Sequence, residues 1–438
     1  MEWAAALTLM LGVLVVLMAV GLPVAFAFLG VNIVGAFLFL GGTVGLDQMA
    51  RNTMAAISNF SLAPIPLFLL MGEILFHSGV AFLAINAIDR LIAKVPGRLS
   101  IVSVAGGTVF SSLSGSTIAN TAVLGSALLP DMLKRGYHPT IAMGPIMATG
   151  SIAMLIPPSA LAVLLGSLAG ISIAQLLIAG IVPGLMMATA FLSYILLRCT
   201  FNRSLAPAYD VEHMSLAERW KPFFIYVVPL LGIFVVVVGS ILAGWATPTE
   251  SAALGSVASV VAAVAYGKFS ISKMVQALLE TAKISVMILF IIAASVTFSQ
   301  ILAFSGATTG LLQVIETVGA SPFALLLAML LVLLFLGAFM DQVSMIMITL
   351  PFFIPLATSL DLNLLWFGVL MLVVMEISFM TPPFGLLIYV MKGVAPKSIS
   401  LKDVYTAALP FIGLQLIVLG ILIMFPEAAT WLATLVRK

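Results

Sequence analysis

The sequence predicts an all-α polytopic membrane protein that is an inverted repeat of two units. Three observations lead to this prediction: the composition, a duplication, and apolar segments that are broken in the middle. Of the 438 residues, 63% are hydrophobic and 8% are charged, whereas a soluble protein needs about 25% charged residues. At about 20 apolar residues per span, the chain is long enough to cross the bilayer about ten times. The lipid bilayer is therefore its expected environment.

The remaining composition excludes several classes of function. The net charge is +2, and the absence of a basic cluster argues against a nucleic-acid partner. Cys199 is the single cysteine, which excludes an intrachain disulfide, a thiolate metal site and thiol redox chemistry. The three histidines are scattered, so no cluster of histidine ligands for a catalytic metal is expected. We also expect no organic cofactor and no metal other than a transported ion.

An internal duplication is visible as a constant offset. A shift of 225 residues superimposes several prolines and glycines: Pro23 on Pro248, Gly30 on Gly255, Pro130 on Pro355, and Pro157-Pro158 on Pro382-Pro383. Because the offset is held over about 135 residues, the sequence predicts two homologous units.

Each unit is predicted to contain five spans, one amphipathic stretch and one re-entrant hairpin. Continuous apolar runs predict the spans, and a more polar run at helical spacing predicts the amphipathic stretch. Small or polar residues interrupt an apolar segment of about 35 residues at the hairpin, and Pro-Pro breaks the following helix. In the first unit the ranges are 4–22, 23–42, 43–57 (amphipathic), 58–77, 79–94 (weakly helical), 100–135 (hairpin), 139–172 (broken helix) and 173–197. In the second unit they are 223–243, 248–266, 267–283, 284–304, 307–318, 323–360, 363–395 and 404–426.

The odd number of spans predicts that the two units have opposite orientations. If the loop at 198–221 is cytoplasmic, 15 of the 18 Lys and Arg residues lie on the cytoplasmic side, and only Arg51, Arg437 and Lys438 lie outside. That asymmetry satisfies the positive-inside rule. Both termini are then expected on the external, periplasmic side.

Broken helices predict where ligands bind, because each break exposes backbone N–H and C=O groups near the midplane. The tip of the first hairpin contains Ser112, Ser114, Gly115 and Ser116, whose hydroxyl and carbonyl oxygens suit a hard cation. The alternative is close helix packing through small residues.

The second hairpin places Asp341 at the position of Ser116. An ionisable residue inside apolar sequence is a functional candidate, and a carboxylate suits a sodium ion. The alternative is a helix N-cap, which is compatible with ion binding.

The two Pro-Pro breaks supply the other half of each predicted site. Proline removes the N–H that would bond a carbonyl one turn earlier, so carbonyls near 152–154 and 378–379 become free. The alternative is a simple kink, which is less favoured because both units carry the same break.

Other acidic residues are predicted to be mainly structural. Thr247, Pro248 and Glu250 form a capping-box pattern, and Glu73 and His77 are spaced as a pair on one helix face. Glu376 near the second break is either a supporting residue of the site or a buried structural group.

Several motifs together resemble the large membrane subunit of tripartite ATP-independent periplasmic (TRAP) transporters. They are Ser114-Gly115-Ser116, the run from Leu129 to Tyr137, Ile156-Pro157-Pro158-Ser159, the run from Ala246 to Glu250, Phe339-Met340-Asp341 and Thr381-Pro382-Pro383. The resemblance covers nearly the whole chain, with one departure at Asn120, where a small apolar residue is expected.

The resemblance implies an elevator-type sodium symporter for an organic acid, located in the bacterial inner membrane. It implies two partners: a small four-helix membrane subunit (DctQ-like) and a secreted, periplasmic substrate-binding protein (DctP-like). The implied domains are scaffold helices at 1–42, an arm at 43–57, the first half of the transport domain at 58–198, a cytoplasmic loop and scaffold helices at 199–266, an arm at 267–283, and the second half of the transport domain at 284–438.

The resemblance and the breaks together assign two sets of site residues. The sodium ligands are Ser112, Ser114, Gly115, Ser116, Gly150, Ser151, Gly337, Asp341, Ser378 and Thr381. The substrate cavity is assigned to Thr117, Asn120, Pro157, Pro158, Ser159, Ser344, Pro382 and Pro383.

Two other classes of function remain as alternatives: a self-sufficient symporter and a membrane-embedded enzyme. A self-sufficient sodium/dicarboxylate symporter of related architecture would need no soluble partner. An enzyme is not expected, because no His-Glu-x-x-His pattern and no paired intramembrane aspartates occur in the sequence.

Overall fold

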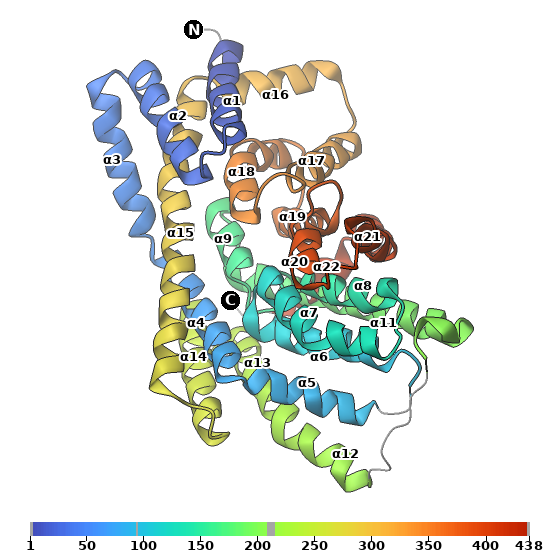
Figure 1. The fold of residues 1–438 in the computed structure, drawn as a ribbon. Coiled ribbons are helices and arrows are strands. Elements are labelled where there is room, and N and C mark those ends of the chain that lie inside the picture. Colours follow the sequence, from blue (N-terminus) through green and yellow to red (C-terminus); the bar gives the residue numbers. More distant parts are fainter. Residues whose placement is uncertain (1–2, 93–94, 208–214, 436–438) are drawn as a thin grey trace. The chain divides into compact units, whose positions relative to one another are not determined.

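The computed structural model describes residues 3–92, 95–207 and 215–435, and the side chains of residues 112–114 lie outside that description. The described residues form helices throughout, as Figure 1 shows, which confirms the all-α prediction. Their contacts divide the chain into two compact units. Unit 1 comprises Met1–Ala63, Ala282–Leu333 and Met340–Leu364, and unit 2 comprises Pro64–Thr281, Leu334–Phe339 and Leu365–Lys438.

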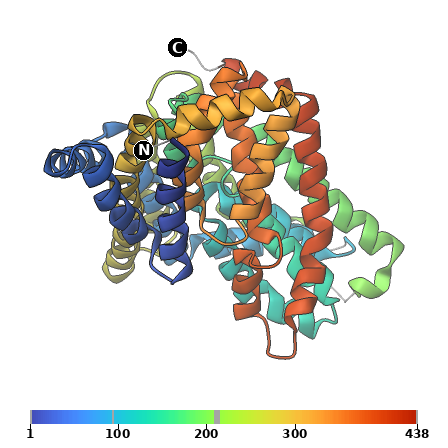
Figure 2. The same ribbon diagram turned by 90° about the horizontal axis from the view of Figure 1, so that it is seen from above.

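Unit 1 contains the N-terminal helices and four helices, or most of them, from the second half of the sequence. Its helices are α1 (Trp3–Ala19), α2 (Val24–Phe39), α3 (Thr43–Ile57), the 3-10 turn η1 (Phe60–Leu62), most of α15 (Ile271–Phe304), α16 (Ala307–Val318), most of α17 (Pro322–Leu336), and α18 (Gln342–Ser359). Helix α1 packs against α2 and α16 (Figures 1 and 2). The buried Asn32 of α2 donates a hydrogen bond to the carbonyl of Ala294 on α15, so helices from the two halves of the sequence share one core.

Helix α15 is a single uninterrupted rod (Figure 1). The sequence predicts an amphipathic stretch over 267–283 and a separate span over 284–304, but the structure joins them. The reason is local: residues 271–304 contain no Gly or Pro, so nothing interrupts the hydrogen bonds of the helix. Its 34 residues extend about 51 Å, well beyond the hydrocarbon thickness of about 30 Å. In the first half, Asn59 and Pro64 separate the corresponding α3 and α4.

Unit 2 contains the remaining helices. They are α4 (Pro64–Ser78), α5 (Val80–Leu91), α6 (Arg98–Ser114), α7 (Thr117–Lys134), α8 (Pro139–Gly150), α9 (Ala160–Ala169), α10 (Ile173–Ala179), α11 (Ile181–Phe201), η2 (Arg203–Leu205), α12 (Leu216–Pro222), the π-helical segment η3 (Phe223–Val227), α13 (Val228–Leu242), α14 (Pro248–Ala265), α19 (Leu364–Met380), α20 (Leu386–Val394), α21 (Leu401–Met424), α22 (Glu427–Thr430) and η4 (Trp431–Leu435).

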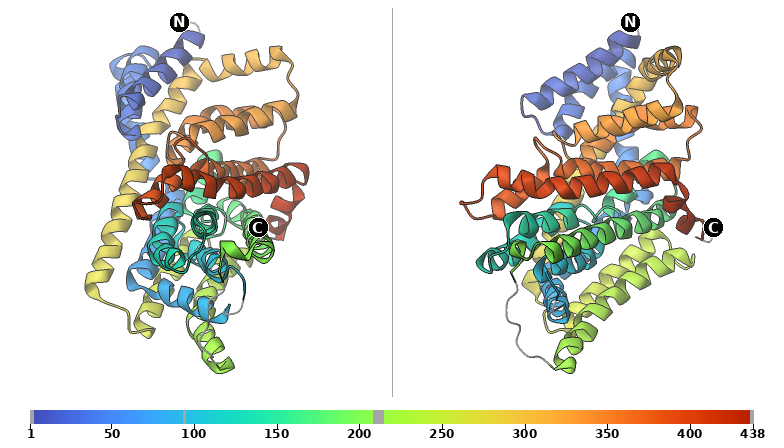
Figure 3. Two further views of the ribbon diagram at one scale, coloured as in Figure 1. Left: turned by 45° about the vertical axis from the view of Figure 1, so that its right-hand side comes forward. Right: turned by 90° about the vertical axis from the view of Figure 1, so that its right-hand side faces the viewer.

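The core of unit 2 is built around α8. Every residue from Ile141 to Gly150 is buried, because α6, α7 and α21 all pack against this helix. Figure 3 shows α21 as a long rod that runs beside α8 and α11. The predicted final helix of the first repeat, 173–197, is divided at Gly180 into α10 and α11.

Seven helical segments among the described residues are long and apolar enough to cross a membrane. Further apolar helices of 10–17 residues include α1, α2, α9, α17 and α19. The short apolar helices α9 and α19 adjoin the Pro-Pro breaks, where proline divides a longer apolar segment. Length and composition therefore make the chain a multi-pass membrane protein.

Candidate functional site

The first predicted hairpin folds as α6 and α7, which pack against each other and are joined by a tight turn. Gly115 ends α6 in the left-handed region with φ of +58°, which favours glycine. A Cβ atom at Gly115 would lie 2.8 Å from the carbonyl oxygen of Pro158. The hairpin tip therefore lies directly against the first Pro-Pro break.

Ser116 begins α7 as its N-cap. Its Oγ accepts a hydrogen bond from the backbone N–H of Ala119 at 3.3 Å, so one function of this serine is to satisfy the start of the helix. The side chains of Ser112 and Ser114 lie outside the described residues, and their assignment to a sodium site stays a prediction.

The first broken helix is interrupted from Ser151 to Ser159, between α8 and α9. The Pro157–Pro158 peptide bond is cis. Ser159 caps α9, with Oγ accepting from Ala162 N–H at 3.2 Å. The break thus places the carbonyl end of α8 and the N–H end of α9 next to the hairpin tip, which is the arrangement of dipoles that attracts cations and anions respectively.

Gly150 allows α7 to approach α8 closely. A Cβ atom there would lie 2.2 Å from Oγ1 of Thr121, so a larger residue would push the hairpin away from the broken helix. Ser151 follows, with its hydroxyl donating to the carbonyl of Ala148 at 2.7 Å. Both residues are buried.

Asn120 connects three elements of the site. Its amide nitrogen donates to Oγ of Ser111 on α6 and to the carbonyl of Thr149 on α8, the latter at 3.3 Å. Ser111 donates to the same carbonyl at 3.1 Å. Asn120 is buried, and its Oδ1 accepts no hydrogen bond from the described residues. The departure from the family pattern is therefore a polar link that holds the hairpin on α8.

Glu376 connects the two sequence repeats inside unit 2. This buried residue of α19 accepts hydrogen bonds on Oε1 from Oγ1 of Thr117 at 2.8 Å and from the backbone N–H of Met154 at 3.1 Å. Thr117 belongs to the first hairpin and Met154 to the first break. The sequence places Glu376 beside the second break, but its partners lie in the first repeat.

Gln415 of α21 is a site residue that the sequence analysis missed. It is buried and donates from Nε2 to Oγ of Ser151, while its Oε1 has no hydrogen-bond partner among the described residues. The sequence did contain a signal for it, because Gln415 is the only amide in the apolar run of α21. A polar side chain inside a membrane helix costs free energy, so it usually has a hydrogen-bonding or functional role.

The residues assigned to the second site fall in both units. Asp341 belongs to unit 1, where it caps α18 by accepting from the N–H of Ser344 at 3.1 Å and from the Ser344 hydroxyl. The N-cap interpretation of Asp341 is therefore confirmed. Gly337 belongs to unit 2, and its assignment to a sodium site remains a prediction.

The second break lies in unit 2, between α19 and α20. Its Pro382–Pro383 bond is also cis. Ser378 and Thr381 donate their hydroxyls to the carbonyls of Met375 and Ile377, at 2.7 and 2.8 Å. These hydroxyls retain lone pairs that could still face an ion.

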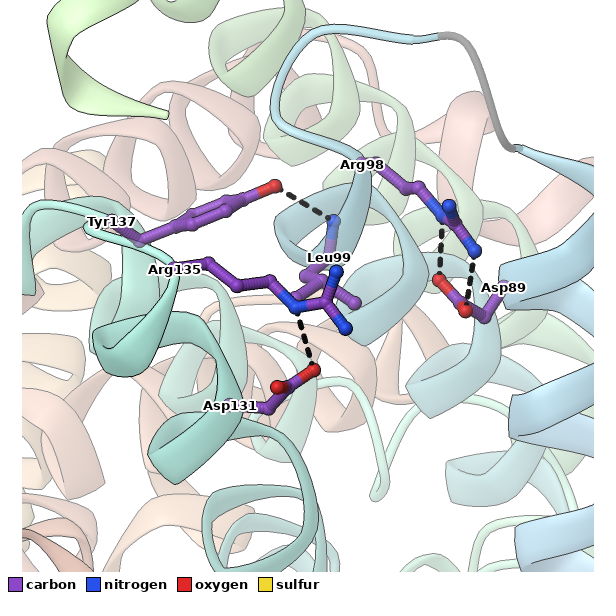
Figure 4. A network of polar contacts seen from close by, with 6 residues as sticks. All are labelled: Asp89, Arg98, Leu99, Asp131, Arg135 and Tyr137. Atoms are coloured by element: carbon purple, nitrogen blue, oxygen red, sulfur yellow. Dashed lines mark hydrogen bonds and ion pairs between the residues drawn. The ribbon is translucent and has the colours of Figure 1, made fainter. Parts of the chain in front are cut away.

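The base of the first hairpin carries two ion pairs, shown in Figure 4. Arg98 at the start of α6 makes two hydrogen bonds to the carboxylate of Asp89 on α5, at 2.7 and 2.5 Å. Arg135 pairs with Asp131 at 2.9 Å, and the backbone N–H of Leu99 donates to the hydroxyl of Tyr137 at 3.4 Å. The bidentate pair is the stronger type of contact and fixes α5 to the hairpin.

Two acidic residues predicted to be structural, Glu250 and Glu73, make the contacts expected of them. Glu250 accepts from the backbone N–H of Thr247 at 2.7 Å in a complete capping box. Glu73 and His77 form an i,i+4 pair at 3.1 Å on α4.

The described residues form several helices long enough to span a membrane, and two helical segments are broken at Pro-Pro. This combination defines a polytopic membrane protein of a type found among secondary transporters. The family model "Tripartite ATP-independent periplasmic transporter, DctM component" matches residues 11–428. The chain belongs to this family, which consists of transporter permeases and not of enzymes.

Individual relatives agree with this assignment. The chain is 32% identical to the C4-dicarboxylate TRAP transporter large permease protein DctM of Rhodobacter capsulatus, over 89% of this chain and 90% of that protein. It is 28% identical to the isethionate TRAP transporter permease protein DctMQ of Oleidesulfovibrio alaskensis, over 98% of this chain and 66% of that protein. Its fold is similar to the Alcanivorax borkumensis YdaH transporter, with a TM-score of 0.63, 15% identity, and coverage of 93% of this chain and 98% of that one.

Proposed function

We propose that this chain is the large subunit of a sodium-driven transporter that takes up an organic acid across the bacterial inner membrane. The observation that carries the proposal is the contact of the first hairpin tip at Gly115 with the Pro-Pro break at Pro158. Helices α6 and α8 end near this contact and present their carbonyl ends to it. Helices α7 and α9 begin there and present their N–H ends. Such a point is suited to a cation and an anion bound side by side.

The first sodium site is assigned to the oxygens of the hairpin tip and of the break. Ser112, Ser114, Gly115 and Ser116 contribute from the hairpin, and Gly150 and Ser151 from the end of α8. Gln415 bonds Ser151 and positions its hydroxyl. The sodium ligands assigned in the second repeat are Asp341 in unit 1 and Gly337, Ser378 and Thr381 in unit 2. Hydroxyl, carbonyl and carboxylate oxygens are the ligands that hard cations prefer.

The substrate is assigned to the N–H ends of the broken helices. The corresponding residues are Thr117, Asn120, Pro157, Pro158 and Ser159 in the first repeat, and Ser344, Pro382 and Pro383 in the second. Helix N-termini and bound sodium ions would neutralise a carboxylate without a fixed Lys or Arg. Relatives are named for C4-dicarboxylate, ectoine, sialic acid and isethionate, so the individual substrate is set by features that differ within the family.

The transport cycle is proposed to be an elevator movement. The two repeats would have opposite orientations, with both termini on the periplasmic side. Scaffold helices at 1–42 and 199–266 and arms at 43–57 and 267–283 would support a transport domain formed by 58–198 and 284–438. The uninterrupted α15 supports the assignment of an arm, because a rigid helix transmits displacement along its length.

Two partners complete the proposed system: a small four-helix membrane subunit and a periplasmic substrate-binding protein. The name DctMQ of the isethionate relative and its greater length support a permease partner that is fused to the large subunit in that protein. The binding protein would capture dilute substrate and deliver it to the external side.

Reconstitution tests the proposal. The chain is placed in proteoliposomes with an inward sodium gradient, and uptake of labelled organic acids is measured with and without the small subunit and the binding protein. We expect uptake only with all components and with sodium, and none when potassium replaces sodium. Saturable sodium-driven uptake by the chain alone would favour a self-sufficient symporter, and uptake independent of sodium would refute the ion assignment.

A further inference from the structure

A cavity of about 330 Å³ lies in unit 2 between α5 and the start of the helix formed by α12, η3 and α13. Helices α5 and α12 are neighbours (Figures 1 and 3). The cavity is lined by Arg90, Asn86 and Leu83 of α5 and by Lys221, Ile225 and Tyr226. None of these residues belongs to the broken helices or hairpins, so the cavity is a separate feature of the fold.

The polar part of the cavity is positively charged. Arg90 and Lys221 are exposed and form no ion pair or side-chain hydrogen bond with the described residues. Among the described residues, the acids next to these two cations in the sequence are engaged elsewhere, Asp89 with Arg98 and Glu218 with the N-cap Ser215. An amide at Asn86 and a phenol at Tyr226 add hydrogen-bond donors. These groups together suit a phosphate or a similar oxyanion.

The apolar part of the surroundings continues onto the membrane face of α13. Phe224 is 60% exposed and Val228 is 41% exposed, and Leu83 and Ile225 line the cavity itself. Exposed apolar side chains on a membrane-spanning helix face acyl chains rather than water.

Aromatic residues mark the depth of the cavity. Trp220, Phe223 and Phe224 form a cluster with ring centroids 5.8–6.0 Å apart, and Trp is enriched at the level of lipid headgroups. The cavity therefore has its cations at headgroup level and apolar side chains on the lipid side.

We propose that this cavity binds the phosphate group of an anionic phospholipid, with the acyl chains lying along η3 and α13. A volume of about 330 Å³ is at the lower end of the range for small-ligand sites and fits a headgroup rather than a whole lipid. Basic pockets between membrane helices are known to hold headgroups of this kind. Because the lipid would touch both α5 and the α12–η3 segment, it would hold these two elements together.

The test is native mass spectrometry of the full-length chain in neutral detergent, titrated with phosphatidylglycerol, cardiolipin or phosphatidylethanolamine. We expect the anionic lipids to bind more tightly than phosphatidylethanolamine, and the double variant Arg90→Gln/Lys221→Gln to bind them about thirty-fold more weakly. That factor corresponds to about 2 kcal/mol, the sum for two cations at about 1 kcal/mol each. The charge-conserving variant Arg90→Lys/Lys221→Arg should retain most of the binding.

The matched control is Lys397→Gln/Lys402→Gln, which removes two positive charges from exposed positions outside the cavity. It should leave anionic lipid binding unchanged. Equal weakening by both double variants would overturn the proposal, because only net charge would then matter. Displacement of the lipid by excess inorganic phosphate would overturn it in favour of a soluble phosphate site. Equal binding of all three lipids would also overturn it.

Discussion

Replacement of Glu376 should separate a hydrogen-bonding role from a role of its charge. In Glu376→Ala, the hydroxyl of Thr117 and the backbone N–H of Met154 lose the acceptor that they share. Both donors are in buried surroundings, and each unsatisfied buried group costs about 1–3 kcal/mol. We therefore expect a loss of roughly 2–6 kcal/mol in the free energy of unfolding. Glu376→Gln keeps a carbonyl oxygen at the same position and should lose much less.

The assay is unfolding of the purified chain in detergent, with tryptophan fluorescence as the signal and Glu316→Ala, an exposed acid on α16, as the control. A double-mutant cycle makes the test sharper. Thr117→Val replaces the hydroxyl with a methyl group of similar size, so it should cost less in the Glu376→Ala background than in the native chain. Equal losses for Glu376→Gln and Glu376→Ala would refute the reasoning, because the carboxylate charge and not the acceptor geometry would then hold the site together.

Two further predictions concern the ion sites and the orientation of the repeats. Asp341→Asn keeps an N-cap acceptor but removes the charge, so the sodium concentration for half-maximal uptake should rise at least about tenfold, a change of about 1.4 kcal/mol, whereas Asp361→Asn at an exposed turn should leave it unchanged. Ser116→Ala should act in the same direction with a smaller effect, and unchanged sodium dependence of both variants would reduce these residues to helix caps. In a Cys199→Ser background, single cysteines at Arg135 and Asp361 should react with impermeant thiol reagents from the cytoplasmic and periplasmic sides respectively. Reaction of both from one side would contradict the inverted repeat.

Features set by short stretches of sequence were predictable. Continuous apolar runs predicted the helical membrane class, because a bilayer accepts only backbones that satisfy their own hydrogen bonds. The Pro-Pro pairs predicted both helix breaks, and Thr247 with Glu250 predicted a capping box that the structure contains. Asp341 was predicted either as an N-cap or as an ion ligand, and the local pattern could not exclude one of them. Each of these signals acts within about one helical turn, so neighbouring residues contain the information.

Features that depend on residues far apart in the chain were decided by the tertiary structure alone. Glu376 bonds a hydroxyl 259 residues away and an N–H 222 residues away, and Gln415 bonds Ser151 across 264 residues. The contact of Gly115 with Pro158 and the cavity beside Arg90 likewise exist only after the helices have packed. A local pattern specifies where a helix starts, stops or breaks, and it leaves open which helix face will meet which. Which helix faces meet depends on the packing of all side chains in the unit together. The type of a single residue does not identify the residue that it will contact.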